Sequence, residues 1–191
     1  MVINYFGNGC FRLQSGDTSV LLNPESNRLK ADVTVKTLTA TDIEPGSGEG
    51  DDVVIPFAGE YEEKGIEIIG FPIPGESTDK FLKTVYTLQW EGMKFVLLGH
   101  LSKPLDATLM EELLEPDVLI LPAGGGHFLE PEVAAKIAKQ LEARIVIPSF
   151  YKTPADFLKA SGKKGEEMEK FVFKQKDILA DKGRVIVLKE N

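Results

Sequence analysis

The most regular part of the hydrophobic pattern runs from Asp117 to Tyr151. Val118 to Leu121 is a continuous apolar run, as expected of a strand that is covered on both faces. After a glycine-rich turn, apolar residues recur every three or four positions, which predicts a helix that begins at Pro131. Arg144 to Pro148 returns as a second apolar strand. Because one short helical crossover joins them, the two strands are predicted to be parallel.

A second unit of the same kind precedes the first. Met93 to Leu98 is predicted to be a strand and Ala107 to about Leu114 a helix. The three predicted strands end in three loops, which are Gly99 to Ser102, Ala123 to Phe128 and Ser149 to Tyr151. In open parallel sheets ligands bind at this edge. We therefore expect the three loops, which hold both histidines of the chain, to share one ligand-binding rim.

The N-terminal half contains short strand-like runs that are separated by turn sequences. These runs are Val2 to Phe6, Cys10 to Gln14, Ser19 to Leu22, Ala31 to Lys36, Val53 to Pro56, Gly65 to Phe71 and Thr84 to Trp90. Thr37 to Asp52 is predicted to be a loop and Gly59 to Lys64 a turn. Near the C-terminus, Lys163 to Lys170 is predicted to be a charged connector and Val185 to Leu188 a strand at a sheet edge. Strands first and alternating helices and strands afterwards predict one α/β domain over residues 1–191, with two mixed sheets packed face to face and helices outside.

Composition and charge exclude several classes of partner. The net charge of −8 and the isoelectric point near 4.9 argue against a sequence-independent grip on nucleic acid, which needs a basic surface. Cys10 is the single cysteine and cannot form an intramolecular disulfide. The N-terminus lacks the pattern of a signal peptide, and no apolar run approaches the roughly 20 residues that span a bilayer. We expect a cytoplasmic protein without a membrane partner; its small-molecule or protein partner and its oligomeric state stay open.

Six short sequences, spread over nearly the whole chain, carry a family resemblance. They are Tyr5 to Phe11, Leu21 to Pro24, Ala31 to Val33, Gly59 to Glu62, Leu119 to Gly125 and Ile145 to Pro148. Together they resemble the metallo-β-lactamase fold, in particular its branch of zinc-dependent hydrolases that includes the ascorbate-6-phosphate lactonase type. The resemblance implies an αββα sandwich and, in its members, a site that holds two zinc ions.

The same resemblance indicates that most zinc ligands are replaced in this chain. The family motif Thr-His-x-His-x-Asp-His corresponds to residues 37–43, and its last histidine follows the strand that ends at Pro148. Apolar residues stand at four of these ligand positions: Leu38, Ala40, Ile43 and Phe150. Asp42 is retained, His100 stands at the position of the bridging aspartate, and Asn23 stands where an aspartate ends the early strands. We expect the four apolar side chains to pack together as a plug.

Two hypotheses of function follow from this donor set. Catalytic zinc usually has three protein ligands, whereas Asp42 and His100 supply two. The favoured hypothesis is a binding or interaction protein with no zinc cofactor and no catalytic residue. The alternative is a zinc-dependent hydrolase of the lactone or phosphoester class, in which Asp42 and His100 bind the metal with a third donor from His127, Glu60 or Glu76. A third hypothesis is a unit that assembles through the strand Val185 to Leu188.

The remaining candidate residues have ordinary structural interpretations beside the functional ones. The ligand-binding rim is predicted to include Asn23, His100, Gly125, His127 and Ser149. The glycines before the helix favour a tight connection over a phosphate site, because the helix start already holds acidic side chains. Ser149 lacks the Gly-x-Ser-x-Gly context of a serine hydrolase. Cys10 has no basic neighbour in the sequence and is predicted to be a buried apolar side chain.

Overall fold

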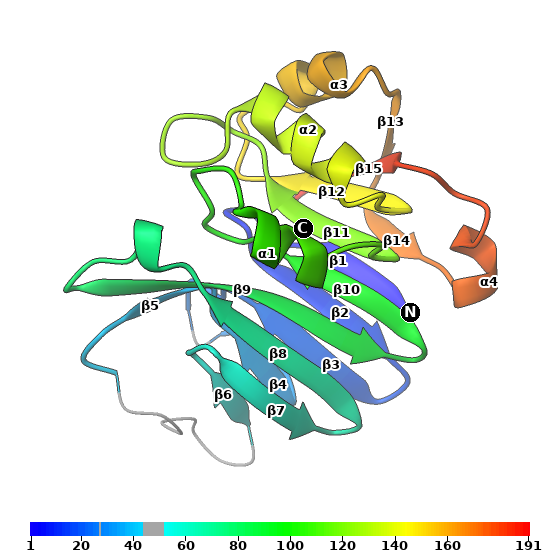
Figure 1. Ribbon diagram of the computed structural model, residues 1–191. Helices are drawn as coiled ribbons and strands as arrows, with labels where there is room; N and C mark the ends of the chain where they lie inside the picture. The colour runs from blue at the N-terminus through cyan, green and yellow to red at the C-terminus, as the bar shows by residue number, and fades with distance from the viewer. Residues whose placement is uncertain (27, 44–51) are drawn as a thin grey trace.

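Two mixed β-sheets packed face to face form the body of the protein (Figure 1). The computed structural model describes residues 1–26, 28–43 and 52–191. The first sheet has the order β14-β1-β2-β3-β4-β6. Its strands are β1 (Val2–Tyr5), β2 (Phe11–Ser15), β3 (Thr18–Leu22), β4 (Val33–Val35), β6 (Val53–Ile55) and β14 (Lys170–Val172). The strands β1 to β3 pair antiparallel, whereas β3, β4 and β6 pair parallel.

The second sheet is larger and has the order β13-β15-β12-β11-β10-β9-β8-β7. Its strands are β7 (Gly59–Glu63), β8 (Ile66–Pro72), β9 (Phe81–Trp90), β10 (Met93–Leu97), β11 (Val118–Pro122), β12 (Ile145–Ser149), β13 (Gly165–Met168) and β15 (Arg184–Leu188). The short strand β5 (Leu38–Ala40) also pairs with β9. The predicted sandwich of two mixed sheets is confirmed.

The helices are few and short. They are α1 (Ala107–Glu112), α2 (Pro131–Gln140), α3 (Ala155–Ser161), α4 (Gln175–Ile178) and the 3-10 helix η1 (Pro74–Glu76). Helices α1, α2 and α3 lie over the outer face of the second sheet (Figure 1). Among the described residues, no helix is both long enough and apolar enough to cross a membrane.

The strands β10, β11 and β12 pair in parallel, as predicted from the two helical crossovers. Every residue of β11 is buried. Val118 and Ile120 face the core between the sheets, whereas Leu119 and Leu121 face the core under the helices. A strand that is covered on both faces needs apolar residues at every position, which explains the unbroken run in the sequence. The carboxyl ends of these strands therefore meet at one edge of the sandwich.

The first sheet is covered differently on its outer side. Val20 and Leu22 face the core between the sheets, so Leu21 points to the opposite face. There it packs with Cys10 and Ala31, and the partly buried Leu29 lies against this small cluster. The loop between β3 and β4 thus covers this face beside the strands.

Four predictions of local structure are wrong. Residues 38–40 of the predicted loop form β5, and most of the predicted turn at 59–64 forms β7; residues 44–51 of that loop lie outside the described residues. Part of the predicted charged connector forms β13, which pairs with β15. The strand β15 is consequently not at an edge, because it lies between β12 and β13. The strands β5, β7 and β13 are short or polar, so they lack the apolar alternation that sequence patterns detect.

Candidate functional site

A cavity of about 1440 Å³ lies at the edge where the carboxyl ends of the parallel strands meet. Its lining includes His100 after β10, residues 123–128 after β11, and residues 150–154 after β12. The first sheet contributes Asn23 after β3 and Lys36 after β4. The three loops of the predicted rim therefore surround one cavity, together with the ends of two strands from the opposite sheet.

A chain of hydrogen bonds joins the two sheets at this cavity. Nδ1 of His100 lies 2.7 Å from Oγ1 of Thr37, and that hydroxyl lies 3.0 Å from Oδ1 of Asn23. The backbone N–H of Thr37 donates to the same Oδ1 at 2.8 Å. Thr37 is 1% exposed. Gly99 permits this close approach, because a Cβ atom there would lie 2.0 Å from Oγ1 of Thr37.

We infer from this geometry which nitrogen of His100 carries the proton. Because the backbone N–H of Thr37 can only donate, the atom of Asn23 that faces it must be the amide oxygen. The Thr37 hydroxyl then donates its single hydrogen to the same oxygen, so it accepts from Nδ1 of His100. These three hydrogen bonds are all satisfied when the proton of a neutral ring is on Nδ1, which leaves Nε2 as a hydrogen-bond acceptor.

The surroundings of His100 favour its neutral form. Burial, with a smaller contribution from the positive charge of Lys83, lowers the pKa of His100 from 6.5 to about 4. The ring also lies 4.9 Å from the ring of Phe150, measured between centroids. At neutral pH this side chain is consequently an uncharged imidazole in a partly apolar setting.

Aromatic rings form one wall of the cavity. The rings of Phe128 and Phe150 stack with their centroids 4.1 Å apart. Phe150 has a backbone φ of +55°, a left-handed conformation that is uncommon for a bulky residue and costs of order 1–3 kcal/mol. Gly9 and Gly124 leave the space that it occupies, since a Cβ atom at either would lie within 2.0 Å of the ring or carbonyl oxygen of Phe150. Strained residues of this kind cluster at functional sites.

The glycine-rich turn before α2 is closed by the protein's own groups. Oε1 of Glu130 accepts a hydrogen bond from the N–H of Gly126 at 3.0 Å. The N–H of Leu129 donates to the carbonyl of Leu101, which joins this turn to the loop after β10. A carboxylate thus already takes the place at this turn where an anion would accept a hydrogen bond from the N–H of Gly126. His127 lines the cavity but is exposed.

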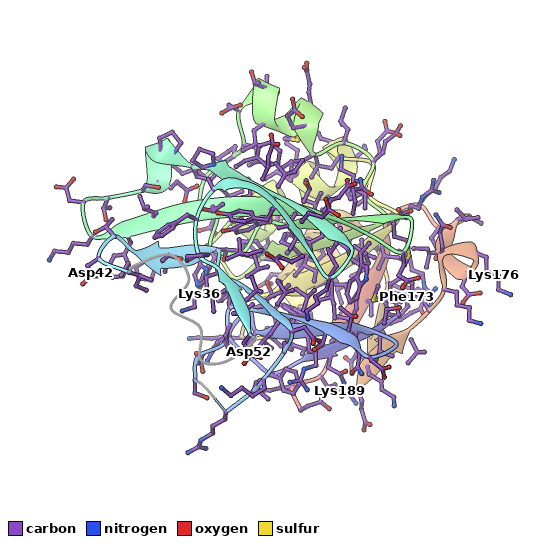
Figure 2. The ribbon with its side chains drawn as sticks, turned by 90° about the horizontal axis from the view of Figure 1, so that it is seen from below. Lys36, Asp42, Asp52, Phe173, Lys176 and Lys189 are labelled. Atoms are coloured by element: carbon purple, nitrogen blue, oxygen red, sulfur yellow. The ribbon has the colours of Figure 1, made fainter. Side chains whose placement is uncertain are left out.

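The donor groups present do not fit the zinc site that the fold implies. Asp42 is exposed, is not among the described residues that line the cavity, and lies beyond the end of β5, away from the sandwich (Figure 2). The Glu76 carboxylate is committed to Lys83, Ser102 and the backbone of Lys103. Within residues 1–26, 28–43 and 52–191, no group of three or more His, Cys, Asp or Glu side chains could hold a metal ion. Of the described candidate donors, only His100 and the exposed His127 line the cavity, and two histidines are fewer than the three protein ligands of catalytic zinc.

The predicted apolar plug does not form as expected. Leu38 and Phe150 line the cavity, whereas Ala40 and Ile43 are not among the described lining residues. Phe150 is only partly buried, because it covers one wall and leaves the space open. The reason is that β5 pairs along β9, which directs residues 38–40 along the second sheet.

Two further candidates have structural positions. Ser149 is 1% exposed, and its hydroxyl donates to the carbonyl of Leu121 at 3.1 Å. It lies outside the described cavity lining, so it does not belong to the rim. Cys10 is buried as predicted, and burial raises the pKa of its thiol to about 11, which keeps it protonated at neutral pH.

Thr37 and Phe128 are the site residues that the sequence did not single out. Thr37 opens the segment that aligns with the zinc motif, and a threonine between a strand and a loop gives no sign of a buried hydrogen-bond partner. Phe128 follows the only other histidine of the chain, but stacking with Phe150 depends on two separate loops. The close contacts of Phe150 with Gly9 and Gly124 mark this part of the site, but only the structure shows them. The sequence alone therefore gave no signal for these two residues.

Comparison with known proteins agrees with this fold. The family model described as "Beta-lactamase superfamily domain" matches residues 2–149. A metal-dependent hydrolase of Natranaerobius thermophilus is 23% identical over 198 residues, with 82% of this chain and 87% of that protein covered. The structure of a candidate Zn-dependent hydrolase of the metallo-β-lactamase superfamily from Thermotoga maritima has a TM-score of 0.79 and 26% identity, covering 98% of this chain and 97% of that one.

A more distant structure has the same fold. Igni18, a metallo hydrolase of Ignicoccus hospitalis, has a TM-score of 0.64 and 20% identity, and the likeness covers 91% of this chain and 99% of that chain. The match of the family model extends over most of the sequence and includes β1 to β12. The chain therefore belongs to the beta-lactamase superfamily.

Proposed function

We propose that this protein binds a small molecule in the cavity beside His100 and does not hydrolyse it with a bound metal. The observation that carries the proposal is the donor set. Four positions at which the resemblance implies metal ligands hold Leu38, Ala40, Ile43 and Phe150. Zinc needs nitrogen, sulfur or carboxylate donors, which these side chains lack. Under this proposal residues 1–191 act as one domain.

The retained cavity supports a role in binding. A site that had no further use could close by packing its apolar replacements together, since protein interiors are close-packed. Here the space of about 1440 Å³ remains, and aromatic rings and one oriented imidazole line it. Pockets for small molecules commonly combine apolar walls with a few placed polar groups.

The relatives favour one alternative, which is a metal-dependent hydrolase. The Natranaerobius thermophilus protein carries that name and matches most of this chain. In this alternative Asp42 and His100 would hold one zinc ion with a third donor, so the loop that contains Asp42 would have to approach the cavity. The two proposals differ in metal content and in hydrolysis.

The test measures both properties on the full chain. We expect less than one zinc per chain by elemental analysis after dialysis, and no metal-dependent hydrolysis of a lactone, a β-lactam or a phosphodiester. Asp42→Ala and His100→Ala should leave the zinc content unchanged. Asp17→Ala, which removes an exposed carboxylate in the turn between β2 and β3 outside the cavity lining, serves as the control. One tightly held metal per chain, lost together with activity in both Asp42→Ala and His100→Ala but not in the control, would establish the hydrolase.

A further inference from the structure

One polar atom of the cavity is poised to receive a hydrogen bond. Nδ1 of His100 is committed to Thr37, so Nε2 is the free nitrogen of the ring. Nε2 has no hydrogen-bond partner among the described residues, and it is not one of the fully buried unpartnered atoms, which are Arg12 Nε and Thr39 Oγ1. It is therefore accessible from the cavity that His100 lines. Because it is an acceptor, a ligand must bring the donor.

The aromatic wall beside this nitrogen favours a flat ligand. Phe150 lies between His100 and Phe128, with ring centroids 4.9 Å and 4.1 Å away respectively. The three rings come from three different loops and form a continuous apolar surface. Aromatic rings pack against one another in offset or edge-to-face arrangements that aliphatic rings do not reproduce. The rings of Tyr5 and Tyr151 also line the cavity.

The charges around the cavity argue against a strongly anionic ligand. The basic lining residues are Lys36, Lys152 and Lys189, and the acidic ones are Glu25, Asp156, Glu167 and Glu190. The two signs nearly balance, so the lining provides no excess positive charge for a phosphate. In addition, Glu130 already accepts a hydrogen bond from the N–H of Gly126 in the turn before α2. A phosphate group at this turn would therefore meet a carboxylate.

We propose that the ligand is a flat aromatic or heteroaromatic molecule with a hydroxyl or ring N–H, which packs on Phe128 and Phe150 and donates that hydrogen to Nε2 of His100. The inference rests on the proposed function, because it names the ligand class of the same cavity. Thr37 and Asn23 act as positioning residues, since they fix the tautomer that accepts. The ligand is released unchanged, so no covalent step is involved.

Three bicyclic probes separate the two requirements. 2-Naphthol is flat and has a donor, 2-methoxynaphthalene is flat without a donor, and decahydro-2-naphthol has a donor without aromatic rings. In calorimetric titrations of the full chain, we expect 2-naphthol to bind roughly threefold to tenfold more tightly than the methyl ether, which is the effect of one neutral hydrogen bond. It should also bind at least about threefold more tightly than the decahydro compound.

Variants connect these preferences to named atoms. His100→Phe keeps a ring and removes the acceptor, so the preference for 2-naphthol over its methyl ether should disappear. Val172→Phe, which adds an aromatic ring at an exposed position of β14 outside the cavity lining, should keep that preference. A long-range proton–nitrogen NMR spectrum should show His100 with its proton on Nδ1, and Thr37→Val should release that tautomer. This spectroscopic change separates a positioning role from a general loss of folding, which thermal unfolding checks in each variant.

Other outcomes have definite meanings. Equal affinity for the three probes, or no binding of any of them, would overturn the ligand class. Tighter binding of 2-naphthyl phosphate than of 2-naphthol would replace it with an anionic class, while the proposed binding function would stand. Metal-dependent release of 2-naphthol from 2-naphthyl phosphate would instead overturn the proposed function itself. A proton on Nε2 of His100 in the ligand-free protein would contradict the assigned acceptor.

Discussion

Thr37 and Thr39 are buried threonines two positions apart whose hydroxyl groups have opposite surroundings. Thr37 bridges Asn23 and His100, whereas Oγ1 of Thr39 has no hydrogen-bond partner. Thr37→Val should lower the free energy of unfolding by about 1–3 kcal/mol, because Nδ1 of His100 loses its partner. Thr39→Val should be neutral or stabilising, because it removes an unsatisfied buried hydroxyl. Urea unfolding midpoints of the two variants test the pair, and equal losses would contradict the assigned bridge.

The depressed pKa of His100 predicts a specific dependence of stability on pH. The unfolded chain protonates this ring near pH 6.5, whereas the folded chain does so only near pH 4. Since the unfolded state binds the extra proton, the free energy of unfolding should fall on acidification from about pH 6.5 to about pH 4, by up to about 3 kcal/mol. Other carboxylates titrate nearby in pH, so the quantity to measure is the difference between wild type and His100→Phe across urea titrations. Parallel pH profiles for the two proteins would refute the shift.

At the residue scale, the sequence indicated which residues lie near the cavity better than it indicated what their side chains contact. Asn23, His100, Gly125 and His127 were expected at the rim and line the cavity. The bond from His100 to Thr37 could not be foreseen, because 63 positions separate them and the contact depends on how two sheets approach. Burial of Ser149 was also missed, since a serine at the end of a strand can point either way.

The turn after β11 is an element whose shape depends on one missing side chain. A Cβ atom at Gly124 would lie 1.7 Å from the carbonyl oxygen of Phe150, which is a backbone atom that cannot rotate away. Gly124→Ala should therefore push the loops after β11 and β12 apart and cost about 1–3 kcal/mol or more. Gly75→Ala is the matched control, because a Cβ atom there meets nothing within 4 Å. Thermal unfolding of both variants tests this, and an unchanged midpoint for Gly124→Ala would show that the loops can separate without cost.

Strands that are buried on both faces were easier to predict from the sequence than strands that are exposed. The strands β11 and β12 are buried at every position, and their apolar runs defined them within one residue. In β13 the residues 166 and 167 are exposed glutamates, and the strand exists because it pairs with β15. A bidentate contact from Arg184 to Glu166, at 2.8 and 2.7 Å, helps to hold that pairing. Such a strand depends on a distant partner, so local pattern cannot reveal it.

For the molecule as a whole, the sandwich followed from the order of elements, but the open cavity did not. Replacement of metal ligands by apolar residues suggested closure, since apolar groups tend to pack together. In the structure β5 pairs with β9, Phe150 has a left-handed backbone, and the cavity is open. Both features arise from the meeting of segments that are far apart in the sequence. Under the proposed function, loss of metal donors and loss of a binding site are therefore separate events.

The hydrogen bonds at His100 also cross from one sheet to the other. Asn23 and Thr37 belong to the ends of β3 and β4, His100 follows β10, and the N–H of Thr84 in β9 donates to the carbonyl of Thr37 at 3.0 Å. An occupant of the cavity would restrain both sheets at this end only. Saturating 2-naphthol should accordingly slow amide hydrogen exchange at Thr84. The slowing should not exceed the factor by which bound ligand stabilises the folded state over the locally opened one.

The opposite end of the sandwich should behave independently. Gly16, in the turn between β2 and β3, lies at the far end of those strands from Asn23. Its amide should exchange at the same rate with and without 2-naphthol, and uniform slowing over both ends would contradict this view. If exchange changes at one end alone, the two sheets separate locally and first at the end without ligand. Occupancy of the cavity then determines which end of the sandwich opens.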